Sequence, residues 1–391
     1  MKLKIEFILM LTVMFILNAC DSTPPSSVEN NQSVKEEKLI PGELAPAAED
    51  GWKNFGTPVT ARIDTLQSRP SRPSASATDP REISTTTLDE LNMSDPFILP
   101  DVETETYYLT SSGGSIYKSK DLKNWEGPYG AYDVTGTWME GINRVAAAEL
   151  QHIGDKYYYI ATWRKQDELV DVVPRRYNVP RSQSMILASD KPEGPYKPLN
   201  PDPNYNYLPY NWSILDGTLW VEDGIPYMFF VHEWVQVIDG TMEYVQLSSD
   251  LSERITEPKC LFRASEAPWV REMTGQKEAT YGMKLPGWVT DAPQLFRTQT
   301  GKLGMLWSSW GANRYAQGVA YSESGTIDGP WLQEENALKG DNSGHGMMFT
   351  TFDGKRLFIV HHVEGNGPRK PYLYEMDDSG DKLVLGKRYH P

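Results

Sequence analysis

The 391-residue chain lacks several features that would assign it to common protein classes. It has only two cysteines, Cys20 and Cys260, so it is not a small scaffold held together by a disulfide framework. Acidic residues outnumber basic ones by 53 to 38, and the net charge of −15 repels nucleic acids and anionic membrane surfaces. No stretch has a strong helical period. We therefore expect no nucleic-acid partner, a neutral substrate and little helix.

The longest apolar run, near the N-terminus, is too short to cross a bilayer. Two lysines precede apolar residues 8–16, whereas a transmembrane helix needs about 20 apolar residues. The run ends in the sequence LNAC at residues 17–20, which is typical of a bacterial lipoprotein signal peptide. We expect residues 1–19 to be removed and Cys20 to carry a lipid. The protein would then be anchored in the bacterial cell envelope, facing the periplasm or at the outer-membrane surface.

Composition divides the remaining chain into two parts. Residues 20–82 are rich in proline, serine, threonine, alanine and charged residues, which predicts a flexible linker behind the lipidated cysteine. Residues 83–391 contain short apolar or aromatic runs separated by turn-forming residues. Five of these runs have the length of a β-strand, at residues 106–110, 156–162, 227–231, 303–307 and 356–360. We expect one all-β domain.

Five short motifs open successive units of this domain. They contain Asp95 in SDPFI, Glu149 in AAEL, Asp216 in ILDGT, Asp291 in TDAPQ and His345 between two glycines. Residues so far apart in sequence share one site only if repeated units meet at a common axis, as in a β-propeller. Their spacing fits five four-stranded units, which predicts a five-bladed β-propeller. Converging carboxylates are what cleavage of a glycosidic bond requires.

In this order, the motifs resemble those of glycoside hydrolase family 43, over about three quarters of the chain. The resemblance implies a five-bladed propeller that hydrolyses with inversion of configuration. It also implies that Asp95 is the general base, that Asp216 modulates the pKa of the acid and orients the substrate, and that Asp291 is the general acid. The family usually has glutamate at position 291, and aspartate is one methylene shorter. Glu233, at the end of a strand-like run, is therefore an alternative acid.

The resemblance implies further contacts around these carboxylates. Glu149 would bond to a sugar or to a neighbouring blade. Arg144, just before it, is a candidate either for bonding substrate hydroxyls or for neutralising this acidic cluster. Trp212 and Trp234 are candidates either for stacking on a sugar ring or for packing between blades. His345 resembles a histidine that points into the central channel, where some family members hold calcium through water. No cofactor is required, and calcium in the channel is an option.

The sequence thus predicts an inverting glycoside hydrolase that removes terminal furanosyl or xylosyl residues from poly- or oligosaccharides. An α-L-arabinofuranosidase ranks first, with β-galactofuranosidase or β-xylosidase next. Insertions at residues 165–182 and 262–288 are the candidate loops that select the sugar. Ala146 and Asp291 depart from the family pattern, which leaves an alternative: a non-catalytic glycan-binding propeller that serves a polysaccharide uptake system. We expect a monomer with a carbohydrate partner.

Overall fold

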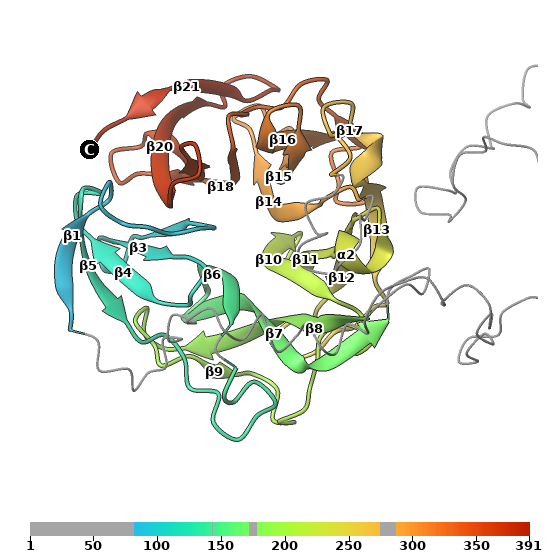
Figure 1. Ribbon diagram of the computed structural model, residues 1–391. Helices are drawn as coiled ribbons and strands as arrows, with labels where there is room; N and C mark the ends of the chain where they lie inside the picture. The colour runs from blue at the N-terminus through green and yellow to red at the C-terminus, as the bar shows by residue number, and fades with distance from the viewer. Residues whose placement is uncertain (1–81, 143, 172–177, 274–286) are drawn as a thin grey trace, which may run out of the picture.

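Five β-sheets surround a central axis in the computed structural model, which describes residues 82–142, 144–171, 178–273 and 287–391 (Figure 1). Each sheet is one blade, and the blades follow one another around the ring in chain order. The all-β, five-bladed propeller predicted from the sequence is therefore confirmed. The expected signal peptide, Cys20 and nearly all of the expected linker lie outside the described residues.

Blade 1 has five strands and each other blade has four, with neighbouring strands antiparallel. Blade 1 contains β1 (Ser84–Thr87), β2 (Phe97–Asp101), β3 (Thr106–Thr110), β4 (Ile116–Ser119) and β5 (Asn124–Tyr129). Blade 2 contains β6 (Val145–Ile153), β7 (Lys156–Asp171), β8 (Asn178–Ser189) and β9 (Lys197–Pro198). Blade 3 contains β10 (Ile214–Glu222), β11 (Ile225–His232), β12 (Thr241–Gln246) and β13 (Lys259–Arg263). Blade 4 contains β14 (Asp291–Arg297), β15 (Leu303–Gly311), β16 (Arg314–Ser322) and β17 (Trp331–Gln333). Blade 5 contains β18 (Ser343–Thr350), β19 (Arg356–Val363), β20 (Arg369–Asp377) and β21 (Val384–Tyr389).

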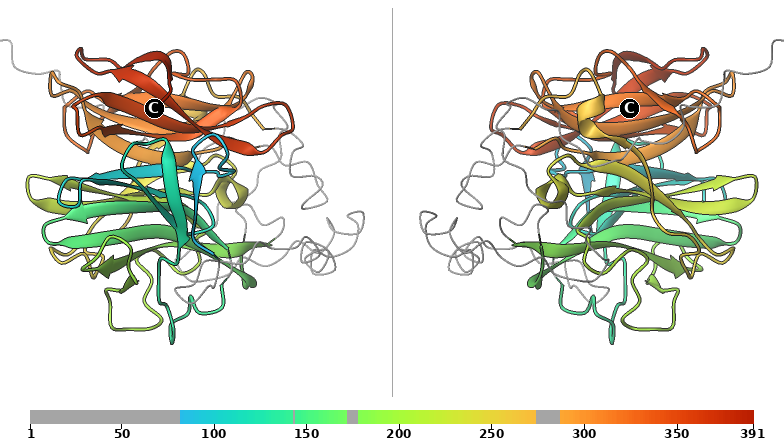
Figure 2. Two further views of the ribbon diagram at one scale, coloured as in Figure 1. Left: turned by 90° about the vertical axis from the view of Figure 1, so that its left-hand side faces the viewer. Right: turned by 90° about the vertical axis from the view of Figure 1, so that its right-hand side faces the viewer.

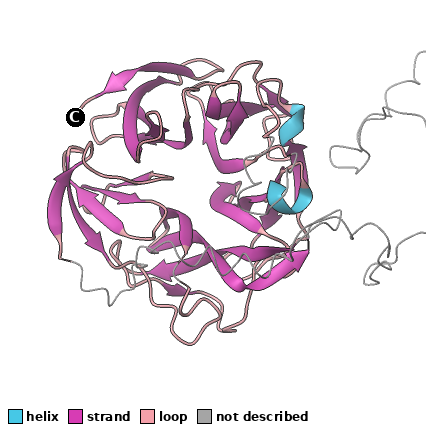
Figure 3. Cartoon of the chain, in the orientation of Figure 1, coloured by secondary structure: helices cyan, strands magenta, loops and turns pink. Residues whose placement is uncertain are grey.

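Helical structure is confined, among the described residues, to two single turns at one side of the ring (Figure 3). These are α2 (Trp234–Val237) and the 3-10 turn η1 (Ala264–Glu266). No helix in the described ranges is long and apolar enough to cross a membrane. The lack of a helical period in the sequence is the reason for this small helical content.

Apolar packing between blades closes the ring. One buried cluster joins Ile98 and Leu109 of blade 1 to Met347 and Ile359 of blade 5, and the side views show these blades next to each other (Figure 2). Each such side chain stabilises the fold by about 1.5–3 kcal/mol when fully buried. This packing joins the last blade to the first and so closes the ring.

Each blade has the same backbone irregularity where its innermost strand begins. One non-glycine residue there has a positive φ, and in blades 2 to 5 the pairing register shifts at this point, as in a β-bulge. The five residues are Asp95 (59°), Ala147 (47°), Asp216 (54°), Ala292 (56°) and His345 (52°). Such backbone conformations are uncommon and concentrate at functional sites.

These bulges correct the repeat positions that we derived from the sequence. Glu149 lies two residues after the bulge position of blade 2, and Asp291 lies one residue before that of blade 4. Only Asp95, Asp216 and His345 occupy equivalent positions. The positions were wrong because we aligned the repeats on their acidic residues, whereas the equivalent positions are defined by the backbone bulge. A shift of one residue turns a side chain to another face of the strand.

The expectation of a loop at residues 165–182 was also wrong for most of its length. Strands β7 and β8 continue through it as a long hairpin, apart from residues 172–177, which lie outside the described residues. Glu168 and Arg181 pair across this hairpin, with 2.6 Å between Oε2 and Nε. Of the second insertion, residues 274–286 lie outside the described residues.

Candidate active site

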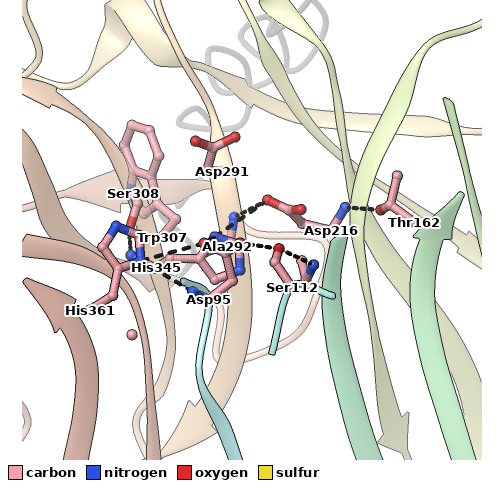
Figure 4. A network of polar contacts seen from close by, with 12 residues as sticks. Asp95, Ser112, Thr162, Asp216, Asp291, Ala292, Trp307, Ser308, His345 and His361 are labelled. Atoms are coloured by element: carbon pink, nitrogen blue, oxygen red, sulfur yellow. Dashed lines mark hydrogen bonds and ion pairs between the residues drawn. The ribbon is translucent and has the colours of Figure 1, made fainter. Parts of the chain in front are cut away.

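Three carboxylates come together where the innermost strands begin (Figure 4). Asp95 precedes β2, Asp216 lies in β10, and Asp291 is the first residue of β14. The side chains of Asp95 and Asp216 are 18% and 7% exposed. These two carboxylates are therefore largely shielded from solvent, and Asp291 is half-buried, so the protonation of all three depends on their neighbours.

Asp95 is surrounded by groups that favour its ionised form. Ser112 Oγ donates a hydrogen bond to Asp95 Oδ2, and His345 Nδ1 lies 3.2 Å from Oδ1. The Asp95 backbone N–H donates to His361 Nδ1 at 3.2 Å. Burial alone would raise the pKa of Asp95, but the charge of His345 and the contacts of His361 and Ser112 hold it well below its usual value. Asp95 is thus ionised and able to accept a proton from water.

Asp216 joins blade 3 to blade 4 beside Asp291. Its Oδ2 accepts the N–H of Ala292 at 2.9 Å, and its own N–H donates to Thr162 Oγ1 at 3.0 Å. Burial raises the pKa of Asp216, although His345, with Nδ1 3.8 Å from Oδ2, opposes this rise. Asp216 therefore fixes the backbone next to Asp291.

Asp291 has the opposite surroundings from Asp95. Burial and the nearby charge of Asp216 raise its pKa well above the usual value for aspartate. Tyr315 donates a hydrogen bond to Asp291 Oδ2 at 3.0 Å. Asp291 consequently retains a proton at a pH where Asp95 has lost its own. A pair of carboxyl groups in these two states can perform general acid and general base catalysis together.

Glu233, the alternative acid, is already bound to other residues. It is 5% exposed, its Oε1 lies 3.2 Å from an Arg164 guanidinium nitrogen, and its Oε2 accepts the Ser213 hydroxyl at 2.8 Å. Both carboxylate oxygens are thus occupied by protein donors. This geometry favours Asp291 over Glu233 as the proton donor.

Glu149 lies between blades 2 and 3. Its Oε2 accepts hydrogen bonds from Thr218 Oγ1 at 2.6 Å and from Gln151 Nε2 at 3.3 Å. Burial raises the pKa of Glu149 to about 8, so the carboxyl group is mostly protonated at neutral pH. Its described contacts join neighbouring blades, and its contact with a sugar stays a prediction.

The other predicted substrate contacts differ in their surroundings. Arg144 is exposed directly before β6. Trp212 is half-buried and stacks on His232 with ring centroids 4.2 Å apart. Trp234 is only 5% exposed and packs in a cluster with Val170, which gives it a packing role. Arg144 and Trp212 stay predicted sugar contacts.

The surroundings of His345 do not provide direct ligands for a metal ion. Its Nδ1 faces Asp95 and Asp216, and the described part of the chain contains no group of three or more His, Cys, Asp or Glu residues that could hold a metal ion. Calcium prefers six to eight oxygen ligands. A calcium ion held through water stays a prediction, and no catalytic step described below depends on it.

We did not predict the side chains that hold the bulges. At four of the five blade junctions, a side chain on or just after the strand next to the innermost one accepts the N–H of the bulge residue in the next blade. The acceptors are Ser112, Thr162, Ser308 and His361. Between blades 3 and 4 this position is Val231, opposite Leu215, and the carboxylate of Asp216 accepts the N–H instead. The sequence signal that could have predicted these acceptors is a serine, threonine or histidine that recurs near the end of the same strand in successive blades.

The comparisons with known proteins agree with this geometry. Residues 89–379 match the family model of glycosyl hydrolases family 43, whereas a search of curated proteins found no match. An endo-arabinase structure from Bacteroides thetaiotaomicron VPI-5482 is 32% identical, with 79% of this chain and 98% of that chain covered and a TM-score of 0.63.

Two more distant structures show the same fold. A thermostable family-43 glycoside hydrolase is 20% identical, with a TM-score of 0.60 and coverage of 78% of this chain and 98% of that chain. An exo-1,5-α-L-arabinanase from a bovine ruminal metagenomic library is 19% identical, with a TM-score of 0.54 and coverage of 78% and 99%. Because the family model spans most of the chain and the 32% identical relative is covered almost completely, this chain belongs to glycosyl hydrolases family 43.

Proposed function

We propose that this glycoside hydrolase cleaves α-L-arabinofuranosyl linkages with inversion at the anomeric carbon. The observation that carries the proposal is the contrast between Asp95, whose neighbours favour the ionised form, and Asp291, whose surroundings favour the protonated form. An inverting glycosidase needs one carboxyl group in each state. The choice of arabinose rests on the 32% identical relative, which is an endo-arabinase.

In the proposed reaction, Asp95 removes a proton from a water molecule as its oxygen attacks the anomeric carbon. The bond from this carbon to the leaving oxygen breaks, and Asp291 donates its proton to that oxygen. His345, His361 and Ser112 keep Asp95 ionised and oriented. Asp216 holds the backbone next to Asp291 through the N–H of Ala292.

The test is hydrolysis of the nitrophenyl glycosides of α-L-arabinofuranose, β-D-galactofuranose and β-D-xylose, followed by linear arabinan. We expect activity on the arabinofuranoside, with the first-formed anomer inverted in proton NMR. Terminal release, as predicted from the sequence, yields only arabinose, whereas internal cuts yield oligosaccharides.

Three results would contradict the proposal in distinct ways. Activity on the xyloside alone would change the sugar, and a retained anomer would remove Asp95 from the role of base. Glycan binding without any hydrolysis would favour the non-catalytic alternative.

We further propose that the enzyme is a monomer anchored by a lipid on Cys20 in the bacterial cell envelope, on the basis of the signal sequence at residues 1–20. Mass spectrometry of the membrane-extracted protein should show a lipidated Cys20 at the N-terminus. Cys20→Ala should release the protein from the membrane fraction. A membrane-bound Cys20→Ala protein would contradict the anchor, and light scattering would detect any oligomer.

A further inference from the structure

A groove lies between blades 4 and 5. Its volume is about 570 Å³, within the ~300–1,000 Å³ of small-molecule sites. The turns joining β15 to β16 and β19 to β20 form it, with Trp310, Arg314, Asn342, Asn366 and Arg369 among the lining residues. Asp291 pairs with Ser308 near the end of β15, so these turns are on the same face as the active site.

Aromatic contacts connect the groove to the proposed acid. The hydroxyl of Tyr315 bonds to Asp291, and its ring contacts the half-buried Trp310 edge to face, with centroids 6.1 Å apart. A general acid protonates the oxygen of the leaving group, so the leaving group lies on the acid's side of the bond. The groove beyond Tyr315 is therefore in position to hold the leaving-group side of the substrate.

The charge of the groove is opposite to that of the whole protein. Arg314 and Arg369 are exposed in it, and no aspartate or glutamate lines it. Arg314 donates to the Gly365 carbonyl at 3.0 Å, and within the described residues neither arginine forms an ion pair with a carboxylate. Glu364, in the same turn, is exposed but is not part of the lining. Two available guanidinium groups suit a carboxylate, which arginine binds with paired N–H donors.

We propose that this groove is a leaving-group subsite for a hexuronosyl residue, with the sugar ring against Trp310 and its carboxylate between Arg314 and Arg369. The assignment to the leaving group rests on the proposed function, whereas binding of the acidic sugar does not. This acidic ligand differs from the neutral substrate that we expected from the net charge. The net charge of −15 describes the protein as a whole, whereas this groove is lined, among the described residues, by two arginines and no carboxylate.

The test is calorimetric titration of the protein with a trisaccharide of galacturonic acid and with its fully methyl-esterified form. The two ligands share their sugar rings and differ in charge. We expect the acid form to bind at least about tenfold more tightly, and its affinity to fall as salt screens the charges. The double variant Arg314→Gln/Arg369→Gln should abolish this preference.

The matched control is Lys123→Gln/Lys387→Gln, which removes the same charge from exposed positions in blades 1 and 5 outside the groove lining. It should bind both trisaccharides as the wild type does, and it should hydrolyse nitrophenyl α-L-arabinofuranoside within about twofold of the wild-type rate. Equal affinity for the two trisaccharides, or unchanged preference in the arginine variant, would overturn the subsite. Lack of furanoside hydrolysis by the wild type would instead refute the proposed function. The titration measures binding without hydrolysis, so it would still test the subsite in that case.

Discussion

Asp95 and Asp291 are two aspartates at one site with opposite surroundings. Asp95 contacts two imidazoles and a serine hydroxyl, whereas Asp291 is half-buried near the charge of Asp216, with the Tyr315 hydroxyl as its hydrogen-bond donor. The pKa of Asp95 is lowered and that of Asp291 is raised. Chemically identical side chains thus acquire opposite pKa shifts from their surroundings.

The blade junctions show a related difference. Hydroxyl or imidazole groups accept the bulge N–H at four junctions, and a carboxylate does so between blades 3 and 4. This carboxylate, Asp216, lies beside Asp291 and raises its pKa. The one junction where a carboxylate accepts the bulge N–H is therefore the junction next to the proposed acid, Asp291.

Replacement of the base should break this contrast most strongly. We expect Asp95→Asn to lower kcat/KM on arabinan by about 10³–10⁴-fold, because the amide cannot accept a proton from water. The control Asp341→Asn removes an exposed carboxylate at another positive-φ position. It should leave the rate within about twofold. A loss below tenfold in Asp95→Asn would remove Asp95 from the role of base.

Replacement of the acid should depend on the leaving group. We expect Asp291→Asn to lower kcat/KM on arabinan by about 10²–10³-fold, and to affect a dinitrophenyl arabinofuranoside much less, because that leaving group departs without protonation. Glu233→Gln is the comparison variant for the alternative acid. Equal losses of Asp291→Asn on both substrates, or a leaving-group effect in Glu233→Gln instead, would transfer the role of acid away from Asp291.

The pH dependence should sharpen the contrast with a smaller effect. The lowered pKa of Asp95 should keep kcat/KM high at acidic pH, and activity should fall at alkaline pH when Asp291 loses its proton. Tyr315→Phe removes a hydrogen bond that lowers the pKa of Asp291. We expect the alkaline limb to move to higher pH and the rate to fall about tenfold. If the alkaline limb stayed in place or moved to lower pH, Tyr315 would not lower the pKa of the general acid.

Glu149 should affect stability more than activity. Because burial raises its pKa from 4.5 to about 8, the folded state keeps a proton that the unfolded chain releases over this range. The free energy of unfolding should therefore fall between pH 4.5 and 8, by at most ~1.4 kcal/mol per pH unit from this group. Glu149→Gln, which mimics the protonated group, should remove this contribution in urea unfolding. An unchanged slope would show that Glu149 titrates normally.

The sequence predicted the architecture well because turn-bounded strand runs and ordered motifs are local signals. It misplaced Glu149 and Asp291 within the repeat because a bulge changes the direction of side chains without a clear sequence mark. It also suggested a loop at residues 165–182, where pairing of Arg181 with Glu168 supports a hairpin of charged strands. Cross-strand contacts of this kind are not visible in a linear pattern.

By itself, the sequence determined the five-bladed all-β fold and the family, and it predicted Asp95, Asp216 and Asp291 as candidate site residues. Only the tertiary structure gave Asp95 surroundings that lower its pKa and Asp291 surroundings that raise it, and it alone brought Tyr315 to Asp291 and two arginines into one groove. The physical reason is that strand patterns depend on neighbours along the chain. Protonation and ligand binding depend on burial and on charges close in space, which come from different blades.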